Sequence, residues 1–188
     1  MKKSLGAGTF AEPTPVWCVG SYDDEGKPNV MAVAWGAICC SKPPCVTVSI
    51  QKIRHSYASI MKRKAYTVSV PSARYIKEAD YFGVASGKDV DKFAQTGLTP
   101  VKSDLVDAPY VKEFPLVLEC KVVHVYDAGL HTLFIGEIMD VKADEEVLNE
   151  KGKIDSSKLK PVIYSPSPRI YYGIGENLGQ AHQIGKDL

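Results

Sequence analysis

The stretch Asn29-Val-Met-Ala-Val-Ala-Trp-Gly36, which runs on to Ser41-Lys-Pro-Pro-Cys-Val-Thr-Val-Ser-Ile50, decides the fold of this chain. Both of its ends are rich in β-branched and apolar residues, so they predict two strands joined by a short, polar connection that contains proline. The sequence Arg54-His-Ser56 follows at once, at the expected start of a helix. A strand pair that leads into such a basic, hydroxyl-bearing corner can hold a flat apolar ring and a phosphate.

The composition is that of an ordinary globular protein. The chain has 188 residues, of which 45% are apolar and 24% are charged, and its net charge is +1. This length fits one domain with its own core, so we expect residues 1–188 to form a single domain, with a mobile tail from about residue 176. The small net charge gives no field that would favour nucleic acid or an anionic membrane.

Two further features predict a cytoplasmic protein. The N-terminal lysines are not followed by an apolar segment, and no run approaches the roughly 20 apolar residues of a membrane span. The five cysteines are an odd number, which argues against a complete disulfide framework. Cys39, Cys40 and Cys45 cluster without a C-x-x-C spacing or a histidine between them, so we expect reduced thiols and no metal.

The hydrophobic pattern predicts a mainly β protein of the α+β class. Strands are expected over residues 15–22, 29–35, 45–51, 65–70, 116–126 and 130–141. Helices are expected over 56–64, from the N-cap Ser72 to Gly83, and over 89–96. Because no crossover helix separates the long strands, the sheet should be antiparallel. The predicted architecture is a small antiparallel barrel with short helices on its outside.

Several familiar catalytic motifs are absent from the sequence. It contains no G-x-G-x-x-G, no Walker glycine loop and no G-x-S-x-G elbow. The four histidines are scattered, and none forms an H-x-x-x-H pair. The sequence therefore gives no support to a Rossmann dehydrogenase, a P-loop NTPase or a serine hydrolase.

A flavin site makes better use of the residues present. The isoalloxazine ring needs an apolar slot and backbone hydrogen bonds, which the strand over 29–35 offers, with Met31 and Trp35 as walls. The ribityl chain needs small polar groups, and the phosphate needs cations and often a helix N-terminus. Suitable residues are Asn29, Cys40 and Ser41 for the ribityl chain, and Arg54, His55, Ser56, Ser86 and Lys92 for the phosphate. By spacing alone, these side chains can equally be ordinary surface or core residues.

Five segments, taken in order, resemble the flavin reductase-like, FMN-binding split-barrel family, and within it the flavoredoxins. The matches run from about residue 10 to residue 172, and their order is more specific than any one of them. They are Asn29-Val-Met31 with Trp35, Ser41-Lys-Pro-Pro44 with Arg54-x-Ser56, Ser69-Val-Pro71, Gly83-x-x-Ser86-Gly-x-x-x-Asp91-Lys-Phe93, and Gly129-Leu-His131-Thr-Leu-Phe-Ile-Gly136.

The resemblance implies an antiparallel split β-barrel homodimer with one FMN per subunit near the dimer interface. Ala32 stands where many members have threonine, so a hydroxyl contact to the flavin is missing there. Some relatives bring a histidine at the position of His131 toward the nicotinamide or substrate side; a strand histidine bonded to backbone is the other interpretation. The implied flavin shell is Asn29, Val30, Met31, Ala34, Trp35, Cys40, Ser41, Arg54, His55, Ser56, Ser86 and Lys92.

Three functions remain open at this point. The first, which the resemblance favours, is an FMN protein that exchanges electrons with a redox partner and needs no catalytic residue. The second is an NAD(P)H-dependent flavin or ferric reductase, in which hydride passes from nicotinamide C4 to flavin N5. The third is a non-enzymatic module that binds flavin or another planar ligand such as haem.

Overall fold

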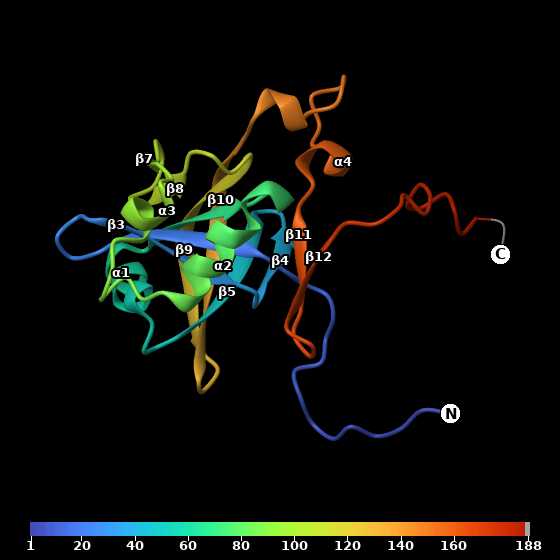
Figure 1. Cartoon of the computed structure of the whole chain (residues 1–188), viewed down its shortest axis with the longest axis horizontal. Helices are drawn as coiled ribbons and strands as arrows, with labels where there is room; N and C mark the ends of the chain where they lie inside the picture. Colours follow the sequence, from blue (N-terminus) through green and yellow to red (C-terminus); the bar gives the residue numbers. More distant parts are fainter. Residues whose placement is uncertain (187–188) are drawn as a thin grey trace.

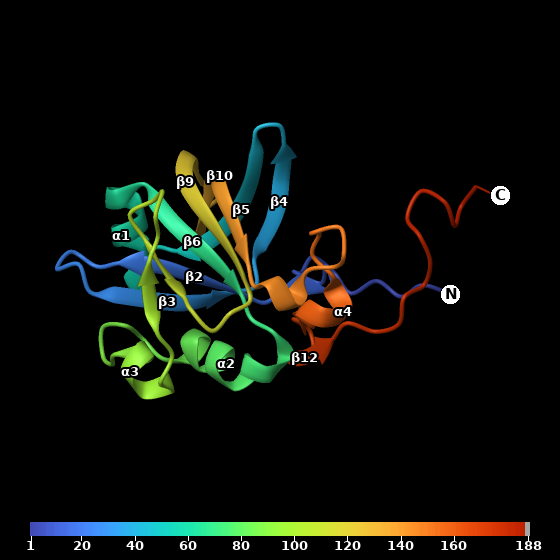
Figure 2. The same ribbon diagram turned by 90° about the horizontal axis from the view of Figure 1, so that it is seen from above.

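A seven-stranded antiparallel sheet forms the body of the protein. The computed structural model describes residues 1–186. The strands lie in the order β3-β2-β6-β9-β10-β5-β4, and Figures 1 and 2 show them curving around a common interior. Their bounds are β2 (Trp17–Tyr22), β3 (Pro28–Val33), β4 (Gly36–Ser41), β5 (Pro44–Gln51), β6 (Ala65–Val70), β9 (Leu116–Asp127) and β10 (His131–Ala143).

Within residues 1–186, the two edge strands of the sheet, β3 and β4, do not pair with each other. Strands β3 and β4 are consecutive in the sequence but occupy opposite edges of the sheet. The chain crosses between the edges at Ala34 and Trp35, where the Trp35 carbonyl accepts a hydrogen bond from the backbone N–H of Ser49 in β5 (2.9 Å). Away from this crossing, β3 pairs only with β2 among the described residues. The fold is thus an antiparallel split β-barrel, and the predicted fold class is confirmed.

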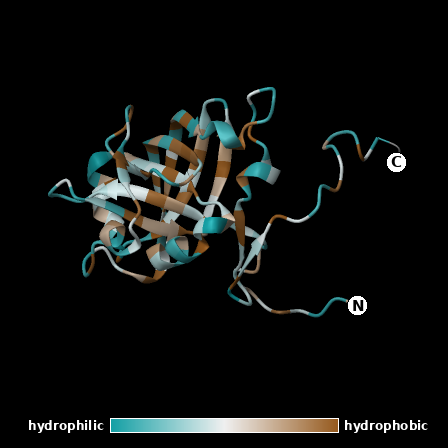
Figure 3. Cartoon of the chain, turned by 45° about the horizontal axis from the view of Figure 1, so that its top comes forward, coloured by the Kyte–Doolittle hydropathy of each residue, from teal (hydrophilic) through white to brown (hydrophobic). Residues whose placement is uncertain are grey.

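Two apolar clusters pack against the sheet. The first fills the barrel and includes Val48, Tyr66 and Phe134, all fully buried. Alternate residues of β5 enter this core, as the strand period requires. The second cluster packs on the outer side of β2 and β3 and contains Phe82 and Phe93. Figure 3 shows brown, apolar stretches concentrated on the strands and teal, polar stretches on the loops and tails.

Short helices flank the barrel. They are α1 (His55–Arg63), α2 (Ile76–Val84), α3 (Lys92–Thr96) and α4 (Ser156–Leu159), with the 3-10 turns η1 (Ala73–Tyr75) and η2 (Glu145–Val147). Figure 2 shows α2 and α3 along β3. Helix α3 begins where the Asp91 carboxylate accepts a hydrogen bond from Ala94 N (3.0 Å), and it ends at Gly97, whose φ is +71°. These caps place Lys92 beside β3.

Two smaller sheets and two extended tails complete the molecule. The smaller sheets consist of β1 (Thr14–Pro15), β11 (Val162–Ser165) and β12 (Ile170–Gly173), and of β7 (Pro100–Lys102) and β8 (Pro109–Val111). Residues 1–13 and 172–186 are exposed, and Figure 1 shows both ends leaving the barrel on the same side. Mobility of the tail stays a prediction. No helix within residues 1–186 combines the length and the apolar character needed to cross a membrane.

Two local predictions were wrong. The segment expected to be a plain connection contains strand β4, which pairs with β5 from Gly36 to Ser41. A β-bulge at Cys39 interrupts its alternation, so no two-residue period reveals it. The helix expected over 89–96 begins only at Lys92, because Asp91 is its N-cap and the residues before it form a turn on the carbonyl of Ser86.

Candidate functional site

A groove runs along the free edge of β3. Its first part is a cavity of about 150 Å³ between β3, the start of α1 and the loop from α2 to α3. Its second part is a cavity of about 260 Å³ in the split of the barrel, between the end of β3 and the end of β5. Met31, Ala32 and Arg54 line both cavities, so the two are adjacent.

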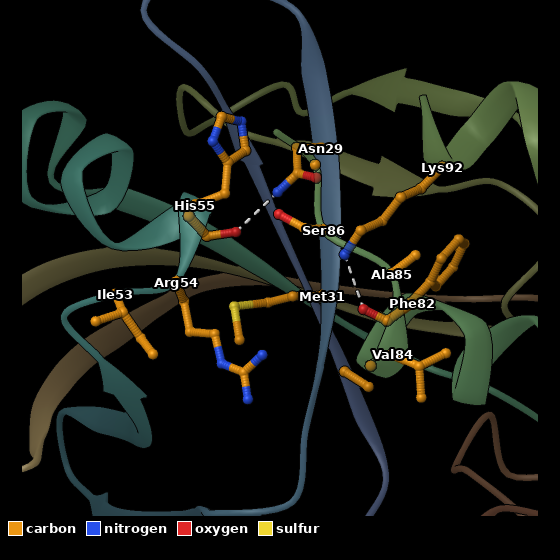
Figure 4. Close-up of a pocket in the computed structure, with 14 residues that line it drawn as sticks. Asn29, Met31, Ile53, Arg54, His55, Phe82, Val84, Ala85, Ser86 and Lys92 are labelled. Atoms are coloured by element: carbon orange, nitrogen blue, oxygen red, sulfur yellow. Dashed lines mark hydrogen bonds between the residues drawn. The ribbon is translucent and has the colours of Figure 1, made fainter. Parts of the chain in front are cut away.

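The start of α1 gives the first cavity a positive character. Arg54 is the N-cap residue of this nine-residue helix, and its side chain makes no capping hydrogen bond. No acidic residue lies in the first turn. The partial positive charge of the helix N-terminus is therefore not offset by a carboxylate within the helix. Figure 4 shows the Arg54 side chain extending past Met31 along the cavity.

Close packing fixes the polar groups on the opposite wall. Asn29 is buried, and its Nδ2 donates a hydrogen bond to Oγ of Ser56 (2.8 Å), which ties β3 to α1. A Cβ atom on Gly87 would lie 2.3 Å from Oδ1 of Asn29 and 2.7 Å from Cδ2 of His55. Because only glycine fits there, the loop backbone after Ser86 can lie directly against these side chains.

Lys92 brings a buried cation to the same cavity. Its Nζ donates hydrogen bonds to the carbonyl oxygens of Val30 (2.9 Å) and Phe82 (2.8 Å). Burial lowers the pKa of Lys92 to about 8; the neighbouring Cys18 thiol opposes this shift, and the charge of Arg54 adds to it. The ammonium group has three hydrogens and donates two of them to carbonyl oxygens, so one remains for a ligand.

The second cavity has a different lining. Met31, Ala34 and Trp35 form its wall on the β3 side, and Gln51 and His131 stand opposite. His131 begins β10 and is paired in register with Gln51. This arrangement gives an open slot with one apolar and aromatic wall and one wall that carries hydrogen-bonding groups.

The structure gathers most of the predicted site residues along the groove but not all of them. Val30 turns its side chain into the second apolar cluster, so only its backbone reaches the site. Cys40 and Ser41 lie exposed on β4 and line neither cavity. Predicted residues that line the groove are Asn29, Met31, Ala34, Trp35, Arg54, His55, Ser56, Ser86, Lys92 and His131.

Several groove residues were not in the predicted set, and Gly87 and Gln51 are the two that matter most for the site. Gly87 follows Ser86 in one of the matched segments, and its place in that segment was the available signal. Gln51 ends β5 and lines the second cavity. Its alternation with Ile50 was the available signal, because it marks a strand face that is wet or lines a site.

Comparison with known protein families identifies the family of this chain. Residues 9–172 match the model of the flavin reductase-like domain. The chain belongs to this family. The predicted family is thus confirmed, and the match includes both walls of the groove.

Individual proteins that are similar to this chain agree with this placement. Flavoredoxin of Desulfovibrio vulgaris (Miyazaki F) is 52% identical, and the superposition covers 99% of this chain and 100% of that one with a TM-score of 0.95. Flavoredoxin from Methanosarcina acetivorans is 29% identical, with 100% and 98% coverage and a TM-score of 0.93. An uncharacterized protein of Archaeoglobus fulgidus is 36% identical over 115 residues, which are 61% of this chain and 65% of that protein.

Proposed function

We propose that this protein binds FMN along the groove and carries electrons through it, in the manner of a flavoredoxin. The observation that carries the proposal is that two unlike cavities, one cationic and one apolar-walled, lie side by side and share Arg54 and Met31. A flavin mononucleotide has the same two ends, a phosphate and an apolar ring. We also propose that residues 1–188 act as one FMN-binding domain.

The first cavity suits the phosphate. The N-terminus of α1, the guanidinium of Arg54 and the free hydrogen of the Lys92 ammonium supply positive charge and donors. Ser56 and Ser86 add hydroxyl groups. Gly87 lets the backbone approach closely, as a site that grips a phosphate through main-chain N–H groups requires.

The second cavity suits the ring. Met31 and Trp35 offer polarizable, apolar walls. Since β3 is an edge strand, its outer N–H and C=O groups are available to the pyrimidine edge of a flavin. The carbonyl of Val30 is the exception, because Lys92 already occupies it.

Electron transfer needs no acid or base from the protein. A bound flavin supplies the redox chemistry, and the chain supplies binding, orientation and electrostatics. The relative with 52% identity is a flavoredoxin, which favours the electron-carrying role and a redox protein as the partner.

A second candidate is an NAD(P)H-dependent flavin reductase, which the family name allows. His131 is the observation that favours it, because it stands on the open side of the ring cavity, across from Met31 and Trp35. There a histidine could orient a nicotinamide or another substrate.

We further propose a cytoplasmic homodimer. Free thiols are typical of the cytoplasm. The tails expose Leu5, Phe10, Ile174 and Leu178, and a second copy would cover such apolar side chains. Light scattering on the purified chain tests the homodimer directly, and a monomer at all concentrations would contradict it.

The visible spectrum of freshly purified protein is the first test of the function. Flavin bands that survive NADH and NADPH under anaerobic conditions, and bleach with dithionite or a partner protein, are the expected result. Rapid bleaching by either nicotinamide would instead establish the reductase. Protein that carries no flavin and cannot be loaded with FMN would overturn both.

A further inference from the structure

The hairpin of β4 and β5 carries three cysteines at the end of the barrel away from the groove. Cys39 and Cys40 are exposed near the end of β4, and Cys45 is the second residue of β5 with only 5% of its surface exposed. Figure 2 shows this hairpin projecting from the body of the barrel. From Cys45 to Gln51 at the groove, the strand spans about 20 Å.

Strand pairing places two of these thiols face to face. Cys40 and Cys45 are direct cross-strand partners in the antiparallel pair, whereas Cys39 is the bulge residue and has no partner. Directly opposite residues point to the same face of a sheet, and their Cα atoms lie about 4.5–5.5 Å apart. Disulfides need a Cα separation of about 4.4–6.8 Å, and directly opposite residues of an antiparallel pair fall within this range.

The two thiols of this pair differ in environment. Glu137 of β10 is the cross-strand partner of Cys45 on its other side, so Cys45 lies between a carboxylate and the β4 thiols. Burial raises the pKa of Cys45, and the charges of Cys39, Cys40 and Glu137 raise it further. Cys45 is therefore a poor thiolate, and the exposed Cys40 is the thiol that an oxidant reaches first.

We propose that Cys40 and Cys45 form a reversible disulfide when the protein meets a peroxide. The Cys40 thiolate attacks hydrogen peroxide, takes one oxygen to become a sulfenic acid, and with one proton releases water. The Cys45 thiol then attacks the Cys40 sulfur, the S–O bond breaks, and the departing hydroxyl takes the Cys45 proton and leaves as a second water. Two electrons pass from the thiol pair to the peroxide, and a dithiol reductant reverses the change.

The proposed disulfide does not depend on flavin binding, because it follows only from the register and exposure of the cysteines in the hairpin. No group of three His, Cys, Asp or Glu side chains within residues 1–186 is arranged to hold an ion. A disulfide with one exposed partner belongs to the labile class that cellular thiols can reduce. The chain therefore carries a peroxide-responsive pair that is chemically separate from its cofactor groove.

The test is a thiol count on the intact protein as purified. The protein is reduced with dithiothreitol, freed of reductant without oxygen, treated with one equivalent of hydrogen peroxide, and assayed with a thiol reagent after denaturation. We expect two of the five thiols to disappear, the monomer mass to fall by two hydrogens, and dithiothreitol to restore both thiols. Differential alkylation with fragment-ion mass spectrometry then locates the bond.

Serine variants assign the partners. Cys39→Ser is the matched control and should still lose two thiols, whereas Cys40→Ser and Cys45→Ser should form at least tenfold less intramolecular bond at the same dose. Cys40 is exposed, so Cys40→Ser tests the assignment even if Cys45→Ser fails to fold. A bond that survives Cys40→Ser, one that appears only between chains, or oxygen addition without a bond would overturn the proposal.

Discussion

Replacing Arg54 by alanine should weaken the binding of FMN far more than the binding of riboflavin. Arg54 is exposed, occupies the N-cap position of α1 and lines both cavities. Riboflavin has the same ring and side chain as FMN but no phosphate. A difference between the two ligands therefore isolates the contact between Arg54 and the phosphate.

The expected magnitude follows from the type of bond lost. A hydrogen bond to a charged group contributes about 1.5–3 kcal/mol, and each 1.4 kcal/mol is tenfold in affinity, so FMN should bind about 10- to 150-fold more weakly. Since Arg54 is exposed, the unfolding free energy should change by no more than about 0.5 kcal/mol. Added salt should narrow the gap between wild type and variant, because it screens the lost charge pair.

Flavin fluorescence titrations of the apoprotein measure both affinities. Arg74→Ala is the matched control, since Arg74 is exposed, lies over the ring of Tyr75 and lines neither cavity. An equal loss for FMN and riboflavin would place Arg54 at the ring instead of the phosphate. Unchanged FMN affinity would remove Arg54 from the site and refute the proposed orientation of the cofactor.

Four other predictions address the cavity wall, the buried cation and the core. Gly87→Ala should weaken FMN binding at least about tenfold, because the added Cβ would lie 2.3 Å from Asn29 and small misplacements in a tight site are costly. Gly173→Ala is the control and should leave the FMN titration unchanged, because a Cβ there meets nothing within 4 Å. FMN affinity should decline as pH rises above 8, where Lys92 loses its proton, and Lys92→Met should bind weakly without this decline. In the apoprotein, Lys92 should make the unfolding free energy rise between pH 8 and 10.5, because in this range the lysine is protonated in the unfolded chain but not in the folded one. Urea unfolding at several pH values across that range measures whether the unfolding free energy rises. Phe134→Ala should cost about 3–5 kcal/mol in urea unfolding, because its side chain is fully buried in the barrel; a loss below 1 kcal/mol would contradict the described core.

Alternation and helical spacing were sufficient to predict most of the barrel. The strand over 65–70 was predicted with the bounds that β6 has, and the helix expected from residue 56 begins one residue earlier. The helix has a period that burial on one face reinforces, whereas β6 is buried along its whole length and ends at Pro71. Strand β4 was missed because the bulge at Cys39 breaks the period and the pairing with β5 holds it in the sheet.

The site was predictable where its residues are local in the sequence. Arg54, His55 and Ser56 are adjacent, so a helix start brought them together without any knowledge of the fold. Gln51 depends instead on the register of β5 with β10, which places it beside His131. Such long-range pairings are fixed by the whole sheet and leave no mark on a short stretch of sequence.

The position of the groove follows from the one irregular feature of the sheet. An edge strand leaves a row of unpaired backbone groups, and proteins cover or block such edges. Here the chain crosses the split at Trp35 but leaves the rest of the outer side of β3 without a strand. A ligand with hydrogen-bonding edges can serve as the missing neighbour, which explains why the candidate ring site lies at this edge.

Lys92 adds an energetic reason for an anion at the same edge. Holding the ammonium where its pKa is about 8 instead of 10.5 costs on the order of 3 kcal/mol at neutral pH. The hydrogen bonds to Val30 and Phe82 offset part of this cost but bring no negative charge. A bound phosphate would restore the lysine pKa toward its ordinary value and recover part of that free energy as affinity. FMN should therefore stabilise the protein against unfolding more strongly than riboflavin at equal free ligand concentration, and Lys92→Met should remove most of that difference.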